Sequence, residues 1–163
     1  MKSEPVASDF RVEKSRTNAI VTLSTGESAH GYFFIAKASA RLTGPERVGE
    51  LLNGQDGFFP FEISEGSYNR TVLYNRLHVV VVMLADSEAQ RDPGYEVAAR
   101  RTISVLLSNG RRLIGNVRIY QPDGHDRLSD WAREGQGFRY VETEEGTFLV
   151  NLMHVIEVSE IAG

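Results

Sequence analysis

The stretch VLLSNGRRLIGNV, residues 105–117, decides the fold. Strand-like runs rich in Val, Leu and Ile flank Asn109-Gly110, and both of these residues tolerate positive φ, so the pattern predicts two strands joined by a tight turn. The stretch VTLSTGESAHGYF, residues 21–33, repeats the pattern 84 positions earlier. Its Gly31 matches Gly115, and a glycine at this point suits a small sheet that curls. We therefore expect the same hairpin twice.

Two more blocks follow each hairpin in the same order. The first carries an apolar stripe at helical spacing, and the second is a strand-like run around an Asn-x-x-His motif. Fifteen positions match in order, with only two changes of offset, which indicates an internal duplication. The matched residues of the first copy are Val21, Leu23, Ser24, Gly26, Gly31, Ile35, Arg47, Gly57, Phe58, Thr71, Leu73, Asn75, His78, Val79 and Val82.

The order of these patterns predicts a mainly β protein. We expect two tandem small five-stranded barrels, each with one short helix between its second and third strands, related by a pseudo-two-fold axis. The expected boundaries are a loose N-terminal arm over 1–16, the first barrel over 17–84, a linker over 85–100 and the second barrel over 101–163. Units of about sixty residues bury a small share of their surface, so we expect them to pack together or to oligomerise.

Composition narrows the function classes. The net charge is −4 and there is no cysteine, which argues against a generic polyanion binder and excludes thiolate metal sites and disulfides. No P-loop, dinucleotide fingerprint or nucleophile elbow occurs. No apolar run is long enough to cross a bilayer. We therefore expect a cytoplasmic protein that is not an enzyme, with no catalytic residues, cofactor, metal or membrane contact.

The repeated Asn-x-x-His motif is the first candidate site. It comprises Asn75 and His78 in one copy, and Asn151 and His154 in the other. The functional interpretation is a pair of ligand sites with imidazole donors or acceptors. The structural interpretation, which we favour, is a turn in which Asn tolerates left-handed backbone and bonds its own main chain.

An arginine cluster around the second hairpin is the other candidate. It comprises Arg101, Arg111, Arg112 and Arg118, with Arg100 beside them. Such a cluster can contact nucleic-acid phosphates or an acidic protein. The alternative interpretation is a solvated strand face with acidic neighbours.

The aromatic pair Phe58-Phe59 hints at an interface. Neighbouring residues of a strand point to opposite faces, so one of the two rings is expected to lie outside its own unit. The same holds for Phe33-Phe34.

The opening hairpin VLLSNGRRLIGNV and the closing segment FLVNLMHVIEV (148–158) together resemble the Sm-like and SH3-type small barrels. The resemblance implies a small five-stranded barrel, ring assembly through the closing hairpin, and RNA contact. The order Arg127-Leu128-Ser129-Asp130-Trp131, then Phe138, then Asn151 and His154 is also similar to a family of uncharacterised bacterial small-barrel domains.

Three functions follow as hypotheses. The favoured one is a non-enzymatic bacterial binding or assembly module whose partner is another protein or a second copy of the chain. The first alternative is an Sm-like RNA-binding protein that uses the arginine hairpin. The second is a small-ligand sensor with a pocket between the two units.

Overall fold

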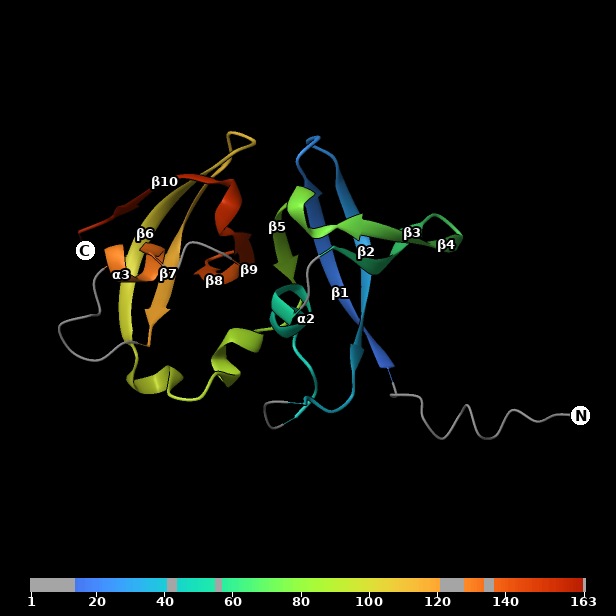
Figure 1. The fold of residues 1–163 in the computed structure, drawn as a ribbon, viewed down its shortest axis with the longest axis horizontal. Coiled ribbons are helices and arrows are strands. Elements are labelled where there is room, and N and C mark those ends of the chain that lie inside the picture. Colours follow the sequence, from blue (N-terminus) through green and yellow to red (C-terminus); the bar gives the residue numbers. More distant parts are fainter. Residues whose placement is uncertain (1–13, 41–43, 55–56, 121–127, 134–136, 163) are drawn as a thin grey trace, which may run out of the picture.

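Ten antiparallel strands form one continuous sheet in the computed structural model, which describes residues 14–40, 44–54, 57–120, 128–133 and 137–162 (Figure 1). The strand order is β10-β6-β7-β8-β9-β5-β1-β2-β3-β4. The strands are β1 (Lys14–Leu23), β2 (Ser28–Ala36), β3 (Phe58–Glu65), β4 (Tyr68–Asn75), β5 (Val79–Leu84), β6 (Ala99–Leu107), β7 (Arg112–Ile119), β8 (Phe138–Thr143), β9 (Gly146–Asn151) and β10 (Val155–Glu160).

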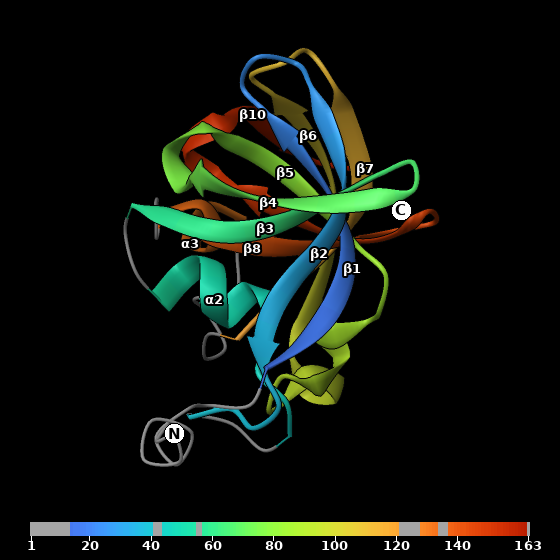
Figure 2. The ribbon, with the colours of Figure 1, turned by 90° about the vertical axis from the view of Figure 1, so that its right-hand side faces the viewer.

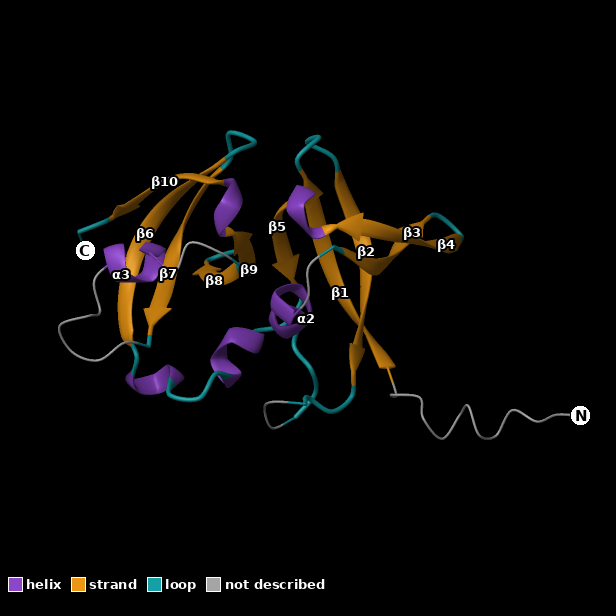
Figure 3. Ribbon diagram, in the orientation of Figure 1, coloured by secondary structure: helices purple, strands orange, loops and turns teal. Residues whose placement is uncertain are grey.

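The described helices separate the strands in a repeated pattern (Figure 3). Helix α2 (Val48–Gly54) lies between β2 and β3, and α3 (Leu128–Arg133) lies between β7 and β8. Short 3₁₀ turns, η1 (Arg76–His78) and η4 (Leu152–His154), precede the last strand of each half. The mainly β class and the helix positions are thus confirmed. The sheet is not closed, so two separate barrels stay a prediction.

The first strand of each half holds its neighbours together. Strand β1 pairs with both β2 and β5, and β6 pairs with both β7 and β10. Each hairpin turns at a glycine with positive φ, 95° at Gly26 and 88° at Gly110, as the turn pattern predicts. In Figure 2 the β3–β4 hairpin crosses the β1–β2 hairpin, so the first half of the sheet is strongly bent.

Gly31 and Gly115 permit this crossing. A Cβ atom on Gly31 would lie 1.9 Å from the carbonyl oxygen of Glu62, and one on Gly115 would lie 2.4 Å from that of Glu142. Neither glycine has positive φ. The physical need is therefore close backbone approach between the second and third strands of each half, and the conservative substitution to alanine would force the strands apart.

The boundaries differ in detail from those expected. Strand β1 begins at Lys14, inside the expected arm, whose first thirteen residues lie outside the described part of the chain. The expected linker, 85–100, holds two more 3₁₀ turns, η2 (Glu88–Arg91) and η3 (Tyr95–Val97), and its last two residues belong to β6. Glu88 and Ala89 are buried. The connection is therefore part of the packed structure.

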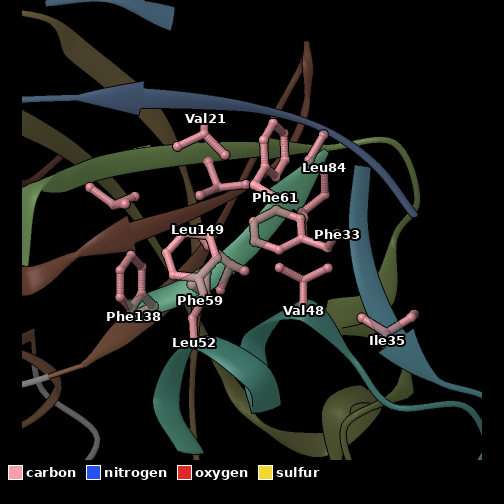
Figure 4. Close-up of a cluster of buried hydrophobic side chains, with 13 residues drawn as sticks. Val21, Phe33, Ile35, Val48, Leu52, Phe59, Phe61, Leu84, Phe138 and Leu149 are labelled. Atoms are coloured by element: carbon pink, nitrogen blue, oxygen red, sulfur yellow. The ribbon is translucent and has the colours of Figure 1, made fainter. Parts of the chain in front are cut away.

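Two apolar clusters fill the interior, and each contains residues of both halves. The first gathers around Phe33, Phe59 and Phe61 and also includes Phe138 and Leu149 from the second half (Figure 4). The second cluster includes Val80 and Val81 from the first half. Each half thus completes its core with side chains of the other.

Arg76 fixes α2 against the first half. Its guanidinium donates to the carbonyl oxygens of Leu51 and Leu52 at the end of α2, at 2.9 and 3.2 Å, and to that of Phe58 at 3.0 Å. Carbonyls at a helix C-terminus lack partners within the helix, so this contact satisfies them. The helix is thereby held beside the first residue of η1, close to the junction of the two halves.

Candidate functional site: the β5–β9 seam

The junction between the halves is an antiparallel pairing of β5 with β9, which we call the seam. Its register pairs Val81 with Val150, Val82 with Leu149, and Met83 with Phe148. All of these residues except Met83 are at most 1% exposed. In Figure 1 the seam lies near the centre, whereas β10 and β4, the two end strands of the sheet, lie on the left and on the right. It is both a hydrogen-bonded ladder and an apolar contact.

Asn151 closes one end of the seam. Its Oδ1 accepts a hydrogen bond from the backbone N–H of Met153 at 3.1 Å, which caps η4. Its Nδ2 donates across the seam to the carbonyl oxygen of Val79 at 2.8 Å and, at 3.4 Å, to that of Arg76. The side chain is therefore both a local cap and a clamp on the other half.

His154 makes a second cross-seam contact. Its Nε2 lies 2.7 Å from the carbonyl oxygen of Leu77 in the first half, and its Nδ1 lies 2.8 Å from Oγ of Ser108. A carbonyl only accepts, so Nε2 carries a hydrogen, and Nδ1 pairs with the serine hydroxyl. Both nitrogens are thus used in holding the turn and the seam.

The first-half copy of the motif makes the local bonds alone. Asn75 Oδ1 accepts from the N–H of Leu77 at 3.0 Å, and His78 Nδ1 lies 3.0 Å from Ser24 Oγ. Within the described residues, Asn75 Nδ2 and His78 Nε2 have no hydrogen-bond partner. These are the two atoms whose counterparts, on Asn151 and His154, reach across the seam. The motif is a turn in both halves, and in the first half its two outer donors have no partner in the part of the chain that the structure describes.

The backbone of this turn corrects one expectation. Asn75 has φ −81° and Asn151 has φ −78°, which is extended and not left-handed backbone. The asparagine is suited to this position by its side-chain oxygen, which reaches the N–H two residues ahead.

Glu88 joins the connection to both halves. Its carboxylate accepts from the N–H groups of Val48 at 3.0 Å and Gly49 at 2.9 Å, at the start of α2, and from the hydroxyl of Tyr140 at 2.6 Å. The residue is 1% exposed, and this burial raises its pKa despite the three donors, which act in the opposite direction. Burial and the neighbouring Glu88 charge likewise raise the pKa of Tyr140, which stays a neutral donor.

Two more side chains of the first half contact segments outside it, Asn53 in the second half and Arg47 in the connection. Asn53 donates through Nδ2 to the carbonyl oxygen of Phe138 at 3.0 Å and accepts from the N–H of the same residue at 2.7 Å. Arg47, only 2% exposed, forms an ion pair with Asp92 and donates to the carbonyl oxygen of Arg91. Sequence reasoning missed Glu88 and Asn53, and for Arg47, which recurs in both copies, it did not find the partner Asp92, because these contacts join segments far apart in the chain.

The candidate arginines are separated along the second half. Arg101 lies 3.8 Å from Glu160, and Arg112 lies 3.1 Å from Glu157, so both face carboxylates of β10. Arg112 also donates to Ser104 Oγ at 2.9 Å. These contacts follow the interpretation of a solvated strand face with acidic neighbours.

The other two arginines contact aromatic rings. The Cζ atom of Arg111 lies 5.2 Å from the centroid of the Phe148 ring, and Arg111 also approaches Glu145 at 3.8 Å. The Cζ atom of Arg118 lies 4.1 Å from the centroid of the Tyr95 ring. Arg118 thus holds the connection, whereas the other three arginines lie near carboxylates. RNA binding through them stays a prediction.

A cavity of about 350 Å³ opens where the halves meet. Asn53 of α2 and Ala89 and Asp92 of the connection line one part of it, and the second half lines the rest with one isoleucine and with aromatic and charged side chains. These are Arg118, Ile119, Tyr120, Trp131, Phe138, Arg139, Tyr140 and Glu142. Burial and Asp92 raise the pKa of the Tyr120 phenol, so it stays neutral at physiological pH. The cavity offers rings and both signs of charge.

Comparison with protein-family models, curated proteins and solved structures returned no match. Among the described residues, no three histidine or acidic side chains converge as metal ligands would. None of the described helices combines the length and apolar character that a membrane crossing requires.

Asn151→Ala and Asn75→Ala form a matched pair that isolates the cross-seam bond. Both substitutions remove a cap on a 3₁₀ turn, but Asn151→Ala also leaves the buried carbonyl of Val79 without its donor. We expect Asn151→Ala to lower the free energy of unfolding by ~1–3 kcal/mol more than Asn75→Ala does. Urea denaturation at low protein concentration measures both. Equal losses would show that the clamp contributes nothing.

Glu88→Gln tests the buried carboxylate. The amide nitrogen of Gln opposes a backbone N–H of α2, so we expect a loss of ~1–3 kcal/mol in unfolding free energy at neutral pH. Burial raises the pKa of Glu88 in the folded chain above its ordinary value of 4.5. The protonated carboxyl group therefore stabilises the fold fully at a pH below the unfolded-state pKa. This stabilisation is lost as the pH rises through the folded-state pKa.

The advantage of the wild-type chain over Glu88→Gln should therefore grow as pH falls from neutral towards 4.5. Urea denaturation across this range gives the difference, and groups common to both chains cancel. If the difference in unfolding free energy between the two chains stays constant or shrinks on acidification, the raised pKa of Glu88 is contradicted.

Proposed function

We propose that this chain is a non-enzymatic binding and assembly module that binds extended strands along its two open sheet edges, β4 and β10. Each half is a bent five-stranded unit of the Sm-like or SH3-like kind, and the two arose by duplication. The observation that carries the proposal is the contrast within the Asn-x-x-His motif. Asn151 and His154 hold backbone carbonyls of η1 and of the first residue of β5, whereas the matching donors of Asn75 and His78 have no hydrogen-bond partner among the described residues.

Apolar side chains at the β3–β4 end support it. Phe58 is 61% exposed, whereas its counterpart Phe138 is 6% exposed and lies in the first core. Leu73 is 65% exposed, whereas its counterpart Leu149 is fully buried there. The same residue types at matching positions are thus buried where a neighbouring unit exists and exposed where it does not. Exposed apolar groups beside an unpaired edge mark an interaction surface.

The β10 end shows the same contrast. Ile156 is 65% exposed, while its counterpart Val80 is fully buried in the second core. An edge strand presents unpaired N–H and C=O groups that a further strand can satisfy, with side-chain pockets supplying specificity. Both ends of the sheet therefore provide backbone and apolar binding groups. The nucleic-acid alternative lacks such support, since Arg101, Arg111 and Arg112 lie near carboxylates.

The small-ligand alternative has one observation in its favour, the cavity at the junction. Its volume of about 350 Å³ falls in the range of small-molecule sites. Trp131, the single tryptophan, lines it and is 5% exposed, so its fluorescence reports on occupancy. Compounds that bind there should change the Trp131 emission, and a panel of aromatic acids and amines without effect counts against this alternative.

A peptide tests strand binding directly. The fluorescein-labelled segment LMHVIEVSEI, residues 152–161, supplies η4 and β10 as a free strand. The receptor is the Ile156→Lys chain, whose own β10 edge is disabled while its β4 edge is intact. We expect saturable binding by fluorescence anisotropy, because the peptide pairs with β4 as β5 pairs with β9.

Two controls define the edge. Adding Leu73→Lys to the receptor should abolish the binding, since it places a charge in the apolar contact. A peptide with Glu157→Pro and Val158→Pro should not bind, because proline lacks the N–H that the ladder needs. Failure of the unmodified peptide to bind, or equal binding in all three cases, would overturn the proposed function.

A further inference from the structure

We infer that the cavity at the junction of the halves binds a small aromatic carboxylate, with the acid group on the guanidinium of Arg118 and the ring beside Trp131. The site is separate from the open sheet edges, so it does not depend on strand binding. It gives a ligand class to the small-ligand alternative. The walls of the cavity carry donors without a partner, whereas their acidic groups are engaged, and this difference favours an anion as the ligand.

Arg118 is held at the wall of the cavity by the connection. Its Nη1 donates to the carbonyl oxygen of Tyr95 at 3.1 Å, and its Cζ lies 4.1 Å from the centroid of the Tyr95 ring. Its Nε is buried without a hydrogen-bond partner, and the side chain forms no ion pair with any residue that the structure describes. Burying a donor without an acceptor costs free energy, which an acceptor on a ligand would recover. The guanidinium is therefore a fixed cation that lacks a carboxylate.

The carboxylates around the cavity already have partners. Asp92 pairs with Arg47 and also accepts from the hydroxyl of Tyr120 at 3.3 Å. The two oxygens of Glu142 accept from the hydroxyl of Tyr95 at 2.7 and 2.9 Å. Burial and Glu142 raise the pKa of Tyr95, so its hydroxyl stays a neutral donor. A cationic ligand would have to compete for these acids, whereas an anionic ligand would not.

The indole of Trp131 supplies a second donor. Trp131 is 5% exposed on α3, and its N–H has no hydrogen-bond partner in the described part of the chain. A buried indole N–H usually finds one. Asn53 and Tyr140, which also line the cavity, have theirs: Asn53 bonds twice to Phe138, and Tyr140 donates to Glu88. Unused donors thus outnumber unused acidic acceptors at this wall.

The rings of the wall favour an aromatic ligand over an aliphatic one. Aromatic rings that pack together gain more than their buried area alone provides. A guanidinium binds a carboxylate through parallel N–H bonds, so it fixes the orientation of an acid more firmly than an ammonium does. The volume of about 350 Å³ lies near the lower end of the range for small-molecule sites, which suits a ligand with one ring. The aromatic side chains that line the cavity are Tyr120, Trp131, Phe138 and Tyr140.

Three probes of similar shape test the charge of the ligand. Phenylacetate, phenylacetamide and phenethylamine share one ring and a short side chain, and they carry a negative charge, no charge and a positive charge. Calorimetric titration of the intact chain gives their affinities, and the emission of Trp131, the single tryptophan, reports on the cavity. We expect phenylacetate to bind about tenfold more tightly than phenylacetamide, because its hydrogen bonds to Arg118 are charge-assisted, and phenethylamine to bind most weakly. Cyclohexylacetate, which keeps the charge without the aromatic ring, should bind more weakly than phenylacetate.

Arg118→Gln removes the charge that the carboxylate needs. We expect the affinity for phenylacetate to fall about tenfold and the affinity for phenylacetamide to change much less. Arg112→Gln is the matched control, because Arg112 lies on the same strand, faces Glu157 and is outside the lining of the cavity. This control should bind as the wild type does. Circular dichroism verifies that both variants are folded, and the three probes on the wild type decide the charge if Arg118→Gln is unstable.

Trp131→Phe keeps a ring and removes the indole N–H. We expect a several-fold loss of phenylacetate affinity by calorimetry, because one hydrogen bond is lost. An unchanged affinity, or binding to the wild type without any change in the emission of Trp131, would show that the ligand lies elsewhere and would overturn its placement in the cavity.

The outcomes separate this inference from strand binding. A chain that binds the peptide of residues 152–161 but none of the three probes overturns the inference and leaves strand binding intact. A chain that binds phenylacetate but not the peptide has the opposite result. Tighter binding of phenethylamine than of phenylacetate would overturn the carboxylate class.

Discussion

The exchange of core residues across the seam is the contact on which the rest of the structure depends. Phe138 and Leu149 enter the first core, and Val80 and Val81 enter the second. A unit of about sixty residues buries a small share of its surface, so its stability alone is marginal, and an unpaired edge strand adds a row of unsatisfied polar groups. The pairing of β5 with β9 satisfies one pair of edge strands and also completes both apolar cores. The buried Glu88 adds a third joint by tying the connection to α2 and Tyr140.

One seam cannot pair all the edge strands of two units. Each unit has a fourth-strand edge and a fifth-strand edge, and joining two units uses one of each, so β4 and β10 are left over. The asymmetry in exposure between Leu73 and Leu149 follows from this count, because the two leucines have the same position in their units and differ only in having a neighbour. The chain therefore buries one contact between a fourth and a fifth strand and leaves the corresponding edges, β4 and β10, open.

Sequence reasoning could reach the elements because they depend on local chemistry. Strand-like runs around Asn109-Gly110 predict the hairpin, and the apolar stripe around Leu52 predicts α2. The adjacent rings of Phe58 and Phe59 predicted one exposed ring, and Phe58 is the exposed one. The seam could not be predicted, since the pairing of β5 with β9 joins segments with no local signal. Glu88 was hidden for the same reason, because its donors are backbone groups 39 and 40 residues away and a tyrosine 52 residues away.

Differences between the copies show how the ends are adjusted. The β3–β4 hairpin has eight-residue strands where the β8–β9 hairpin has six, so the outer hairpin extends past the region that a seam would cover. Strand β10 replaces valine and methionine of β5 with Glu157 and Ser159. Charged residues on an edge strand oppose indiscriminate sheet growth. The Asn-x-x-His motif, in contrast, has the same two residues in both copies. This pattern is expected if the outer edges keep the backbone contact of the seam and lose part of its apolar contact.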